Sequence, residues 1–184
     1  MTRDKILETA DQLIRTKGYN AFSFRDISDT VGIRKASIHY HFPTKSALGV
    51  AILQKRIGQF HKMQEKYSTA SPLQKLKAFL SIYEGIHVEE KVCLVGALAT
   101  DWNTVDDKIR EELKLLSEFV LDWVSQILAE GKAEGVFEFE MESRTKALMI
   151  ITNLIAVLQL SRLTKAADFE LVTKTILNEL EPKV

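Results

Sequence analysis

Apolar residues recur along the chain with the spacing of amphipathic helices. The first segment has apolar residues at i, i+4, i+7 and i+8, a pattern typical of a helix with one buried face, at Ile6, Ala10, Leu13 and Ile14. Gly18 follows and is expected to end this helix, because glycine readily adopts the left-handed backbone that closes a helix. With only 8 Gly and 3 Pro in 184 residues, few positions would interrupt helices. The pattern therefore predicts long helices and requires no strands.

Two short helices are predicted to meet at Gly32. Ser23 is placed to cap the first of them, with Asp26 three residues later as an acidic capping-box partner. The second short helix is expected over residues 35–41, and Gly32 between them suits a tight turn because it tolerates positive φ. Apolar residues occupy the positions that would pack this pair against the first helix, namely Ile27, Val31, Ile33, Ile38 and Phe42. The arrangement is typical of a helix-turn-helix.

The rest of the chain continues with helical periodicity. Thr44 is placed to cap a fourth, longer helix, and the Ser- and Thr-rich stretch 67–72 is the best candidate for a boundary along the chain. Further helices are expected at about 73–87, 94–102, 106–131, 142–164 and 169–180, with Gly131 and Gly135 marking the end of the third of these. The sequence thus predicts an all-α fold of about nine helices. Its expected domains are residues 1–47, a three-helix helix-turn-helix domain, and residues 48–184, a larger helical domain.

The net charge of zero conceals an asymmetry along the chain. Residues 1–66 carry 12 Lys and Arg against 6 Asp and Glu, whereas residues 67–184 carry 13 against 19. A basic first third on an acidic remainder suggests that the N-terminal part meets a polyanion. The sequence shows no apolar segment typical of a signal peptide and no membrane span. The single cysteine, Cys93, cannot form an internal disulfide, so a cytoplasmic protein is expected.

The second short helix offers a surface suited to DNA. Its positions outside the apolar set are basic, small or aromatic, and none is acidic: Arg34, Lys35, Ala36, Ser37, His39, Tyr40 and His41. Arg and Lys can reach guanine edges in the major groove, while Ser, Tyr and His can bind phosphates. The simpler alternative is an αα-hairpin with a solvated basic face. A metal site at His39 and His41 is disfavoured, because residues two apart on a helix point to different sides.

These same residues resemble the DNA-binding domain of the tetracycline-repressor (TetR/AcrR) family. The resemblance covers about residues 3–55 and is most specific in the run from Ile38 to Leu48, IHYHFPTKSAL. His39 stands where the family usually has an aromatic residue, which is a mild departure. The resemblance implies an all-helical repressor that binds a palindromic operator as a homodimer and answers to a small molecule.

The resemblance also implies roles for individual positions. Residues expected to bind phosphates are Ser23, Ser37, Tyr40, His41 and Lys45, and helix N-termini favour anions in any case. Residues expected to face base edges are Arg34, Lys35, Ala36 and His39, while Arg25 could reach base or backbone. No catalytic residue, metal or cofactor is expected.

The C-terminal two-thirds is expected to dimerise and to bind an effector. Residues 147–160 are apolar on most of the helix circumference, so this helix needs burial on several sides, and a second copy of the chain would provide it. A core helix of a monomer is the alternative. Apolar walls with a few polar groups are typical of small-molecule sites. The candidate ligand-binding residues are Tyr83, Trp102, Phe119, Trp123, Met149 and Asn153.

Three functions follow from these patterns and can be separated by experiment. The first is a DNA-binding transcriptional regulator, a repressor released from a palindromic operator by a small organic ligand. The second is an enzyme, although the sequence contains no nucleophile elbow, P-loop, dinucleotide glycine cluster or zincin pair. The third is a helical adaptor that keeps the helix-turn-helix as scaffold. Salt-dependent DNA binding distinguishes the first from the third.

Overall fold

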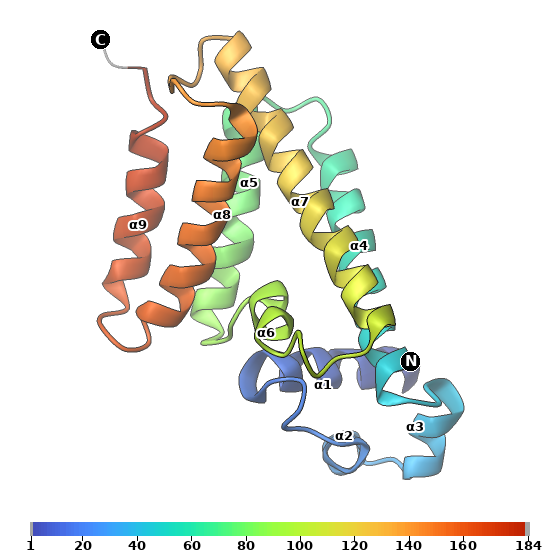
Figure 1. Ribbon diagram of the computed structural model, residues 1–184. Coiled ribbons are helices and arrows are strands. Elements are labelled where there is room, and N and C mark those ends of the chain that lie inside the picture. Colours follow the sequence, from blue (N-terminus) through green and yellow to red (C-terminus); the bar gives the residue numbers. More distant parts are fainter. Residues whose placement is uncertain (1, 183–184) are drawn as a thin grey trace. The chain divides into compact units, whose positions relative to one another are not determined.

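The computed structural model describes residues 2–182, and the regular structure within them is entirely helical (Figure 1). The helices are α1 (Thr2–Lys17), α2 (Phe24–Val31), α3 (Lys35–His41), α4 (Lys45–Lys66), α5 (Pro72–Val88), α6 (Leu94–Thr100), α7 (Asp107–Ala133), α8 (Ser143–Leu160) and α9 (Ala167–Asn178). The predicted all-α fold, with an N-terminal helix-turn-helix followed by further helices, is confirmed. Among the described residues, no helix combines the length and the apolar character needed to cross a membrane.

The described chain forms two compact units. The N-terminal unit contains the residues up to Phe60 together with Cys93–Ser117, and the C-terminal unit contains His61–Val92 and the residues from Glu118 onward. Helices α4 and α7 each contribute to both units. The N-terminal unit is therefore larger than the domain 1–47 expected from the sequence, because α6 and the first part of α7 join it. The functional division into 1–47 and 48–184 stays a prediction.

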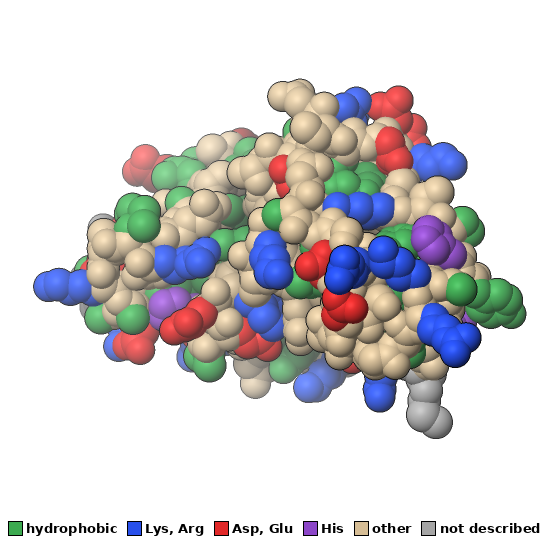
Figure 2. All heavy atoms as spheres, turned by 90° about the horizontal axis from the view of Figure 1, so that it is seen from below, with side chains coloured by type: hydrophobic (Ala, Val, Ile, Leu, Met, Phe, Trp, Pro, Cys, Tyr) green, Lys and Arg blue, Asp and Glu red, His purple; other side chains and the backbone are tan. Residues whose placement is uncertain are grey.

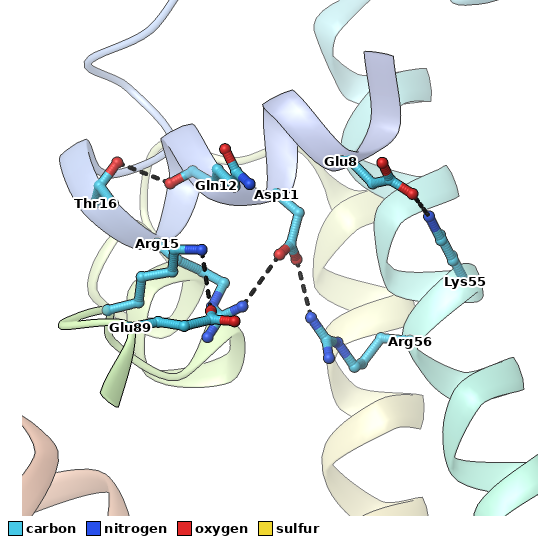
Figure 3. A network of polar contacts seen from close by, with 9 residues as sticks. Glu8, Asp11, Gln12, Arg15, Thr16, Lys55, Arg56 and Glu89 are labelled. Carbon is cyan, nitrogen blue, oxygen red and sulfur yellow. Dashed lines mark hydrogen bonds and ion pairs between the residues drawn. The ribbon is translucent and has the colours of Figure 1, made fainter. Parts of the chain in front are cut away.

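The N-terminal unit is built on α1, which packs against α2, α3 and α6. Its core holds the apolar residues that the sequence pattern placed inward, including Ile6, Ala10, Ile14, Ile27, Ile38, Phe42, Leu48 and Ile52. Ion pairs also link α1 to α4: Asp11 to Arg56 at 3.2 Å and Glu8 to Lys55 at 3.4 Å (Figure 3). Pairs of this kind contribute only about 0–1 kcal/mol each when exposed, so apolar burial supplies most of the stability.

The C-terminal unit is a helical bundle in which α8 packs against both α5 and α9 (Figure 1). The side of α8 that is buried carries Ala147, Ile150, Leu154, Val157 and Leu158. At the centre of the unit, the Phe79 ring meets the edge of Tyr83 at 5.4 Å and of Trp123 at 6.2 Å, measured between ring centroids. Such edge-to-face pairs stabilise a core beyond simple apolar burial.

Most helix ends lie within about two residues of the predicted ones, but α8 ends at Leu160 and not near 164, and α7 continues past Gly131. The capping box predicted at Ser23 is present, since its hydroxyl oxygen accepts from the backbone of α2 while Asp26 accepts from the Ser23 backbone. Gly131 does not end α7, which continues to Ala133, so that prediction is wrong. A Cβ at Gly131 would lie only 2.0 Å from a Phe137 ring carbon, and glycine is there to admit this ring. Gly135, with φ of 70°, adopts the left-handed conformation beyond the helix end.

Candidate nucleic-acid interface

The turn between α2 and α3 is fixed by Gly32 and Ser28. Gly32 adopts φ of 73° and donates its N–H to the Ser28 carbonyl at 2.9 Å. The Ile33 N–H donates to the same carbonyl at 3.2 Å, and the Ser28 hydroxyl donates back to the Ile33 carbonyl at 2.5 Å. The reciprocal bonds between Ser28 and Ile33 lock the angle at which α3 leaves α2. The sequence motif indicated the glycine but not the role of Ser28.

Helix α3 and the residue that follows it turn two apolar side chains inward, and most of the other side chains of α3 are exposed. Ile38 and Phe42 are buried, whereas the side chain of Tyr40 is 85% exposed. Of the ten residues predicted to contact DNA, those exposed are Ser23, Arg25, Arg34, Lys35, Ala36, His39 and Tyr40, and those half-buried are Ser37, His41 and Lys45. Figure 2 shows Lys, Arg and His side chains over one face of the molecule, with Asp and Glu side chains among them. Seven of the ten predicted residues are therefore exposed, and their contact with DNA stays a prediction.

Two residues at the start of α2 that are predicted to contact DNA already bond to acidic side chains of the same helix. The Ser23 hydroxyl donates to Asp26 at 2.7 Å, and the bonds from Ser23 hold the pKa of the Asp26 carboxyl below its ordinary value. The Arg25 guanidinium lies 3.6 Å from Asp29, and both side chains are exposed. An exposed pair at this spacing is weak, so Arg25 can leave Asp29 for a phosphate at small cost.

His39 packs against Phe24 at the position where the resemblance was weakest. The two ring centroids are 4.9 Å apart in an edge-to-face arrangement, and His39 Nδ1 lies 3.3 Å from the Pro43 carbonyl oxygen. The imidazole therefore packs against Phe24, at a position where the family usually has an aromatic residue, while its Nδ1 bonds to the turn after α3. Among the described residues, no three His, Cys, Asp or Glu side chains come together in a way that could hold a metal ion.

Lys45, at the start of α4, has a role that the sequence did not indicate. Its ammonium donates to the Phe22 carbonyl at 2.5 Å and lies 4.7 Å from the Tyr19 ring centroid and 4.2 Å from that of Phe22. Burial lowers the pKa of the ammonium, while the charges of Asp101 and Asp26 oppose that shift. Lys45 thus joins α4 to the segment between α1 and α2. Its predicted contact with phosphate stays a prediction.

A carboxylate from the segment after α6 holds that same α1–α2 segment. Asp101 accepts hydrogen bonds from the Tyr19 backbone N–H and the Asn20 side-chain amide, each at 2.9 Å. Asn20 also donates to the Thr104 hydroxyl at 2.7 Å. Burial, together with the negative charge of Asp106, raises the pKa of the Tyr19 phenol to about 12. These bonds join residues more than 80 positions apart, so sequence reasoning did not find them.

Replacing Asp101 with alanine is expected to destabilise the N-terminal unit. The partly buried Tyr19 N–H would lose its acceptor, which costs about 1–3 kcal/mol in free energy of unfolding. The α1–α2 segment, which leads into the Ser23 cap, would also become less ordered, and DNA affinity should fall several-fold. Chemical denaturation and fluorescence anisotropy with labelled DNA measure the two effects.

Asp107→Ala provides the matched control for this prediction. Asp107 forms an ion pair with Arg110 at 2.9 Å, but its side chain is 86% exposed. Its removal is expected to cost less than about 1 kcal/mol and to leave DNA affinity unchanged. If the Asp101→Ala protein behaves like the Asp107→Ala protein in both measurements, Asp101 does not stabilise the α1–α2 segment.

The structure does not gather all six predicted ligand-binding residues. Tyr83 and Trp123 are buried and each packs its ring against Phe79, and Phe119 is half-buried with its ring 4.4 Å from that of His61. Met149 and Asn153 are exposed on α8, and the half-buried Trp102 belongs to the N-terminal unit. The six residues thus do not form one cluster, and ligand binding by any of them stays a prediction.

The geometry of α1, α2 and α3 defines a helix-turn-helix protein. The family model described as "Bacterial regulatory proteins, tetR family" matches residues 6–52. A solved TetR transcriptional regulator from Legionella pneumophila is 30% identical, covers 98% of both chains and superposes with a TM-score of 0.88. The chain belongs to the TetR family.

Two curated relatives are also transcriptional regulators. A helix-turn-helix-type regulator in the lacX 3′ region of Lactococcus lactis subsp. lactis is 32% identical over 121 residues, and the match spans 62% of each chain. The repressor KstR2 from Mycolicibacterium smegmatis is 29% identical over 150 residues, which cover 76% of this chain and 69% of KstR2.

Proposed function

We propose that this protein is a transcriptional repressor that binds a palindromic DNA operator as a homodimer and is released by a small organic effector. The observation that carries the proposal is the exposed surface of α3, which is basic, small and aromatic without an acidic residue. Such a surface can enter a major groove, where Arg34 and Lys35 reach base edges while Ser37 and His41 bind phosphates. A protein with this role acts on chromosomal DNA and thus in the cytoplasm.

Dimerisation is supported by the apolar side chains that α8, α9 and the turn between them leave exposed. Leu148, Met149, Leu160, Leu163 and Leu171 are all exposed in the single chain. A second copy of the same surface, related by a two-fold axis, would cover them. Two copies would also place two α3 helices on one operator, and half-sites one helical turn apart correspond to about 34 Å along the DNA.

Release by an effector requires only that the ligand prefer a conformer whose α3 helices do not match the operator. The buried aromatic residues of the C-terminal unit, Tyr83 and Trp123, are suited to line an apolar ligand site. Asp101 and Lys45 are hydrogen-bonded to the segment between α1 and α2. Through these bonds, a shift of the backbone after α6 or at the start of α4 would reach α2.

In vitro transcription tests the sign of regulation. Purified protein is added to polymerase and a promoter that overlaps the protein's own binding site, with a promoter lacking that site as control. The proposal expects the transcript to fall with protein concentration from the first template alone. An increase in the transcript would identify an activator instead.

A further inference from the structure

Helix α2 carries an exposed pair of opposite charges, Arg25 and Asp29, four residues apart. The Arg25 guanidinium Nε lies 3.6 Å from the Asp29 carboxylate, and the two side chains are 77% and 71% exposed. Residues two positions apart on a helix point roughly 200° apart, so both charges project from the side of α2 opposite the fully buried Ile27. The pair therefore faces away from the core of the N-terminal unit.

Asp29 differs in its surroundings from the other acidic residue of the helix-turn-helix. Residues 18–45 contain two acidic residues, Asp26 and Asp29. Asp26 accepts from the Ser23 backbone N–H at 2.8 Å and closes the capping box of α2. Asp29 lies beyond the first turn, where a carboxylate gains little from the positive end of the helix dipole, and its described ion-pair partner is Arg25. An exposed carboxylate here repels DNA phosphates, so any favourable contribution it makes to DNA binding comes through Arg25.

Arg25 lies next to a contact between α2 and α3. Phe24, the residue before it, packs against His39 with the two ring centroids 4.9 Å apart. His39 is exposed on α3, the helix that we propose to enter the major groove. The first helix of a helix-turn-helix crosses the DNA backbone while the second lies in the groove. A long side chain that leaves α2 beside His39 can thus turn to a phosphate or to a base edge.

The nitrogen through which Arg25 meets Asp29 favours the base edge. A guanidinium presents its N–H donors in a rigid plane, and an end-on bidentate pair with guanine O6 and N7 uses the two terminal nitrogens. The ion pair with Asp29 is made through Nε, which that end-on pair leaves free. A guanine can therefore bind the terminal nitrogens while the carboxylate stays on Nε. A phosphate at the same nitrogens would come close to Asp29, whose charge repels it, whereas the guanine edge is uncharged.

We propose that Asp29 is a specificity-determining residue that positions Arg25 to read a guanine, an inference that rests on the proposed function and adds one base to it. The carboxylate holds Nε, restricts rotation of the guanidinium, and leaves the terminal nitrogens to donate to O6 and N7. The pair is weak in water and strengthens when the DNA groove excludes water from it. On other sequences Arg25 has to leave Asp29 to reach a phosphate. Asp29 therefore raises the ratio of operator affinity to non-operator affinity.

Fluorescence anisotropy with three kinds of labelled duplex tests the proposal. They are the operator recovered by selection from random DNA, operators with each conserved guanine changed in turn to adenine, and a scrambled duplex. For the unchanged protein, one of the guanine changes is expected to lower affinity about tenfold or more. In Asp29→Asn the loss at that guanine should shrink to about threefold or less, and the preference for operator over scrambled DNA should fall about tenfold. Arg25→Lys keeps the charge but cannot form the bidentate pair, so it should lose the preference for that guanine.

Two further variants show whether the effect belongs to the pair. Asp29→Glu keeps a carboxylate within reach of Arg25 and should retain the preference for guanine. Asp107→Asn is the matched control, because Asp107 forms an exposed pair with Arg110 at 2.9 Å on α7 of the same unit. It should bind every duplex as the unchanged protein does, and circular dichroism checks that all variants are folded.

The inference is overturned if Asp29→Asn raises the affinities for operator and scrambled DNA by the same factor, since Asp29 would then only repel phosphates. It is also overturned if Asp29→Asn binds like the Asp107→Asn control, or if Arg25→Lys keeps the full preference for the guanine. In each of these cases the unchanged protein still prefers its operator, and the proposed function stands. An unchanged protein that does not distinguish operator from scrambled DNA would instead overturn the proposed function.

Discussion

Removing Arg34 and Lys35 together is expected to weaken binding to the operator by about 100-fold or more. Arg34 occupies the position before α3 without a side-chain capping bond, Lys35 begins the helix, and both side chains are exposed and without a described ion pair. A side chain that reads a base edge contributes about 1–3 kcal/mol, so two of them in each subunit account for at least this loss. Fluorescence anisotropy with an operator duplex and with a scrambled duplex measures both affinity and discrimination.

The Lys62→Ala, Lys77→Ala double variant is the control, since it removes the same charge from exposed positions on α4 and α5. It should bind the operator nearly as tightly as the unchanged protein. The Arg34 and Lys35 variant should also lose most of its preference for operator over scrambled DNA. Equal losses in the two double variants would mean that α3 contributes only net charge and does not read sequence.

Placing acidic residues at Leu160 and Leu163 is expected to produce a monomer with greatly reduced operator affinity. Leu160 is 55% exposed and Leu163 is 83% exposed in the single chain, and both border an apolar depression of about 460 Å³ along α8. Burying two carboxylates against their own copies in a two-fold interface costs several kcal/mol. Analytical ultracentrifugation reports the change in mass.

The accompanying loss of DNA affinity follows from the linkage of the two half-sites. A dimer that holds one half-site presents its second α3 at high effective concentration, an advantage of about 10²–10⁴-fold that a monomer lacks. Leu115→Glu is the control, because Leu115 is 61% exposed on α7, within the N-terminal unit. It should remain dimeric. A doubly substituted protein that also remains dimeric would place the interface elsewhere.

The helices could be predicted from the sequence because their signals are local. Gly18, Gly32 and the capping box at Ser23 mark ends that lie within a few residues of the side chains that cause them. Gly131 misled the prediction because its reason lies in Phe137, whose ring returns over the helix from the following loop. A glycine that admits a neighbour and a glycine that ends a helix look the same in sequence.

The candidate site was predictable only as far as it depends on helix periodicity. The spacing of Ile38 and Phe42 determined which side of α3 is exposed, and the structure agrees. The inward bond of Lys45 and the ties of Asp101 depend on contacts across 23 and more than 80 residues, for which the pattern holds no information. Met149 and Asn153 were predicted to line a ligand site but lie on the exposed side of α8. The helix is apolar on most of its circumference, so its periodicity did not reveal which side is buried.

Selection from random duplex DNA with the purified protein, followed by sequencing, tests the central claim most directly. The account predicts a palindromic consensus whose half-sites are centred about one helical turn apart, because two α3 helices related by a two-fold axis read them. The selection should be repeated at low salt and after unfolding and refolding have removed any bound ligand. If no consensus emerges under these conditions, the protein is not a sequence-specific dimeric repressor, and the helix-turn-helix serves as a scaffold.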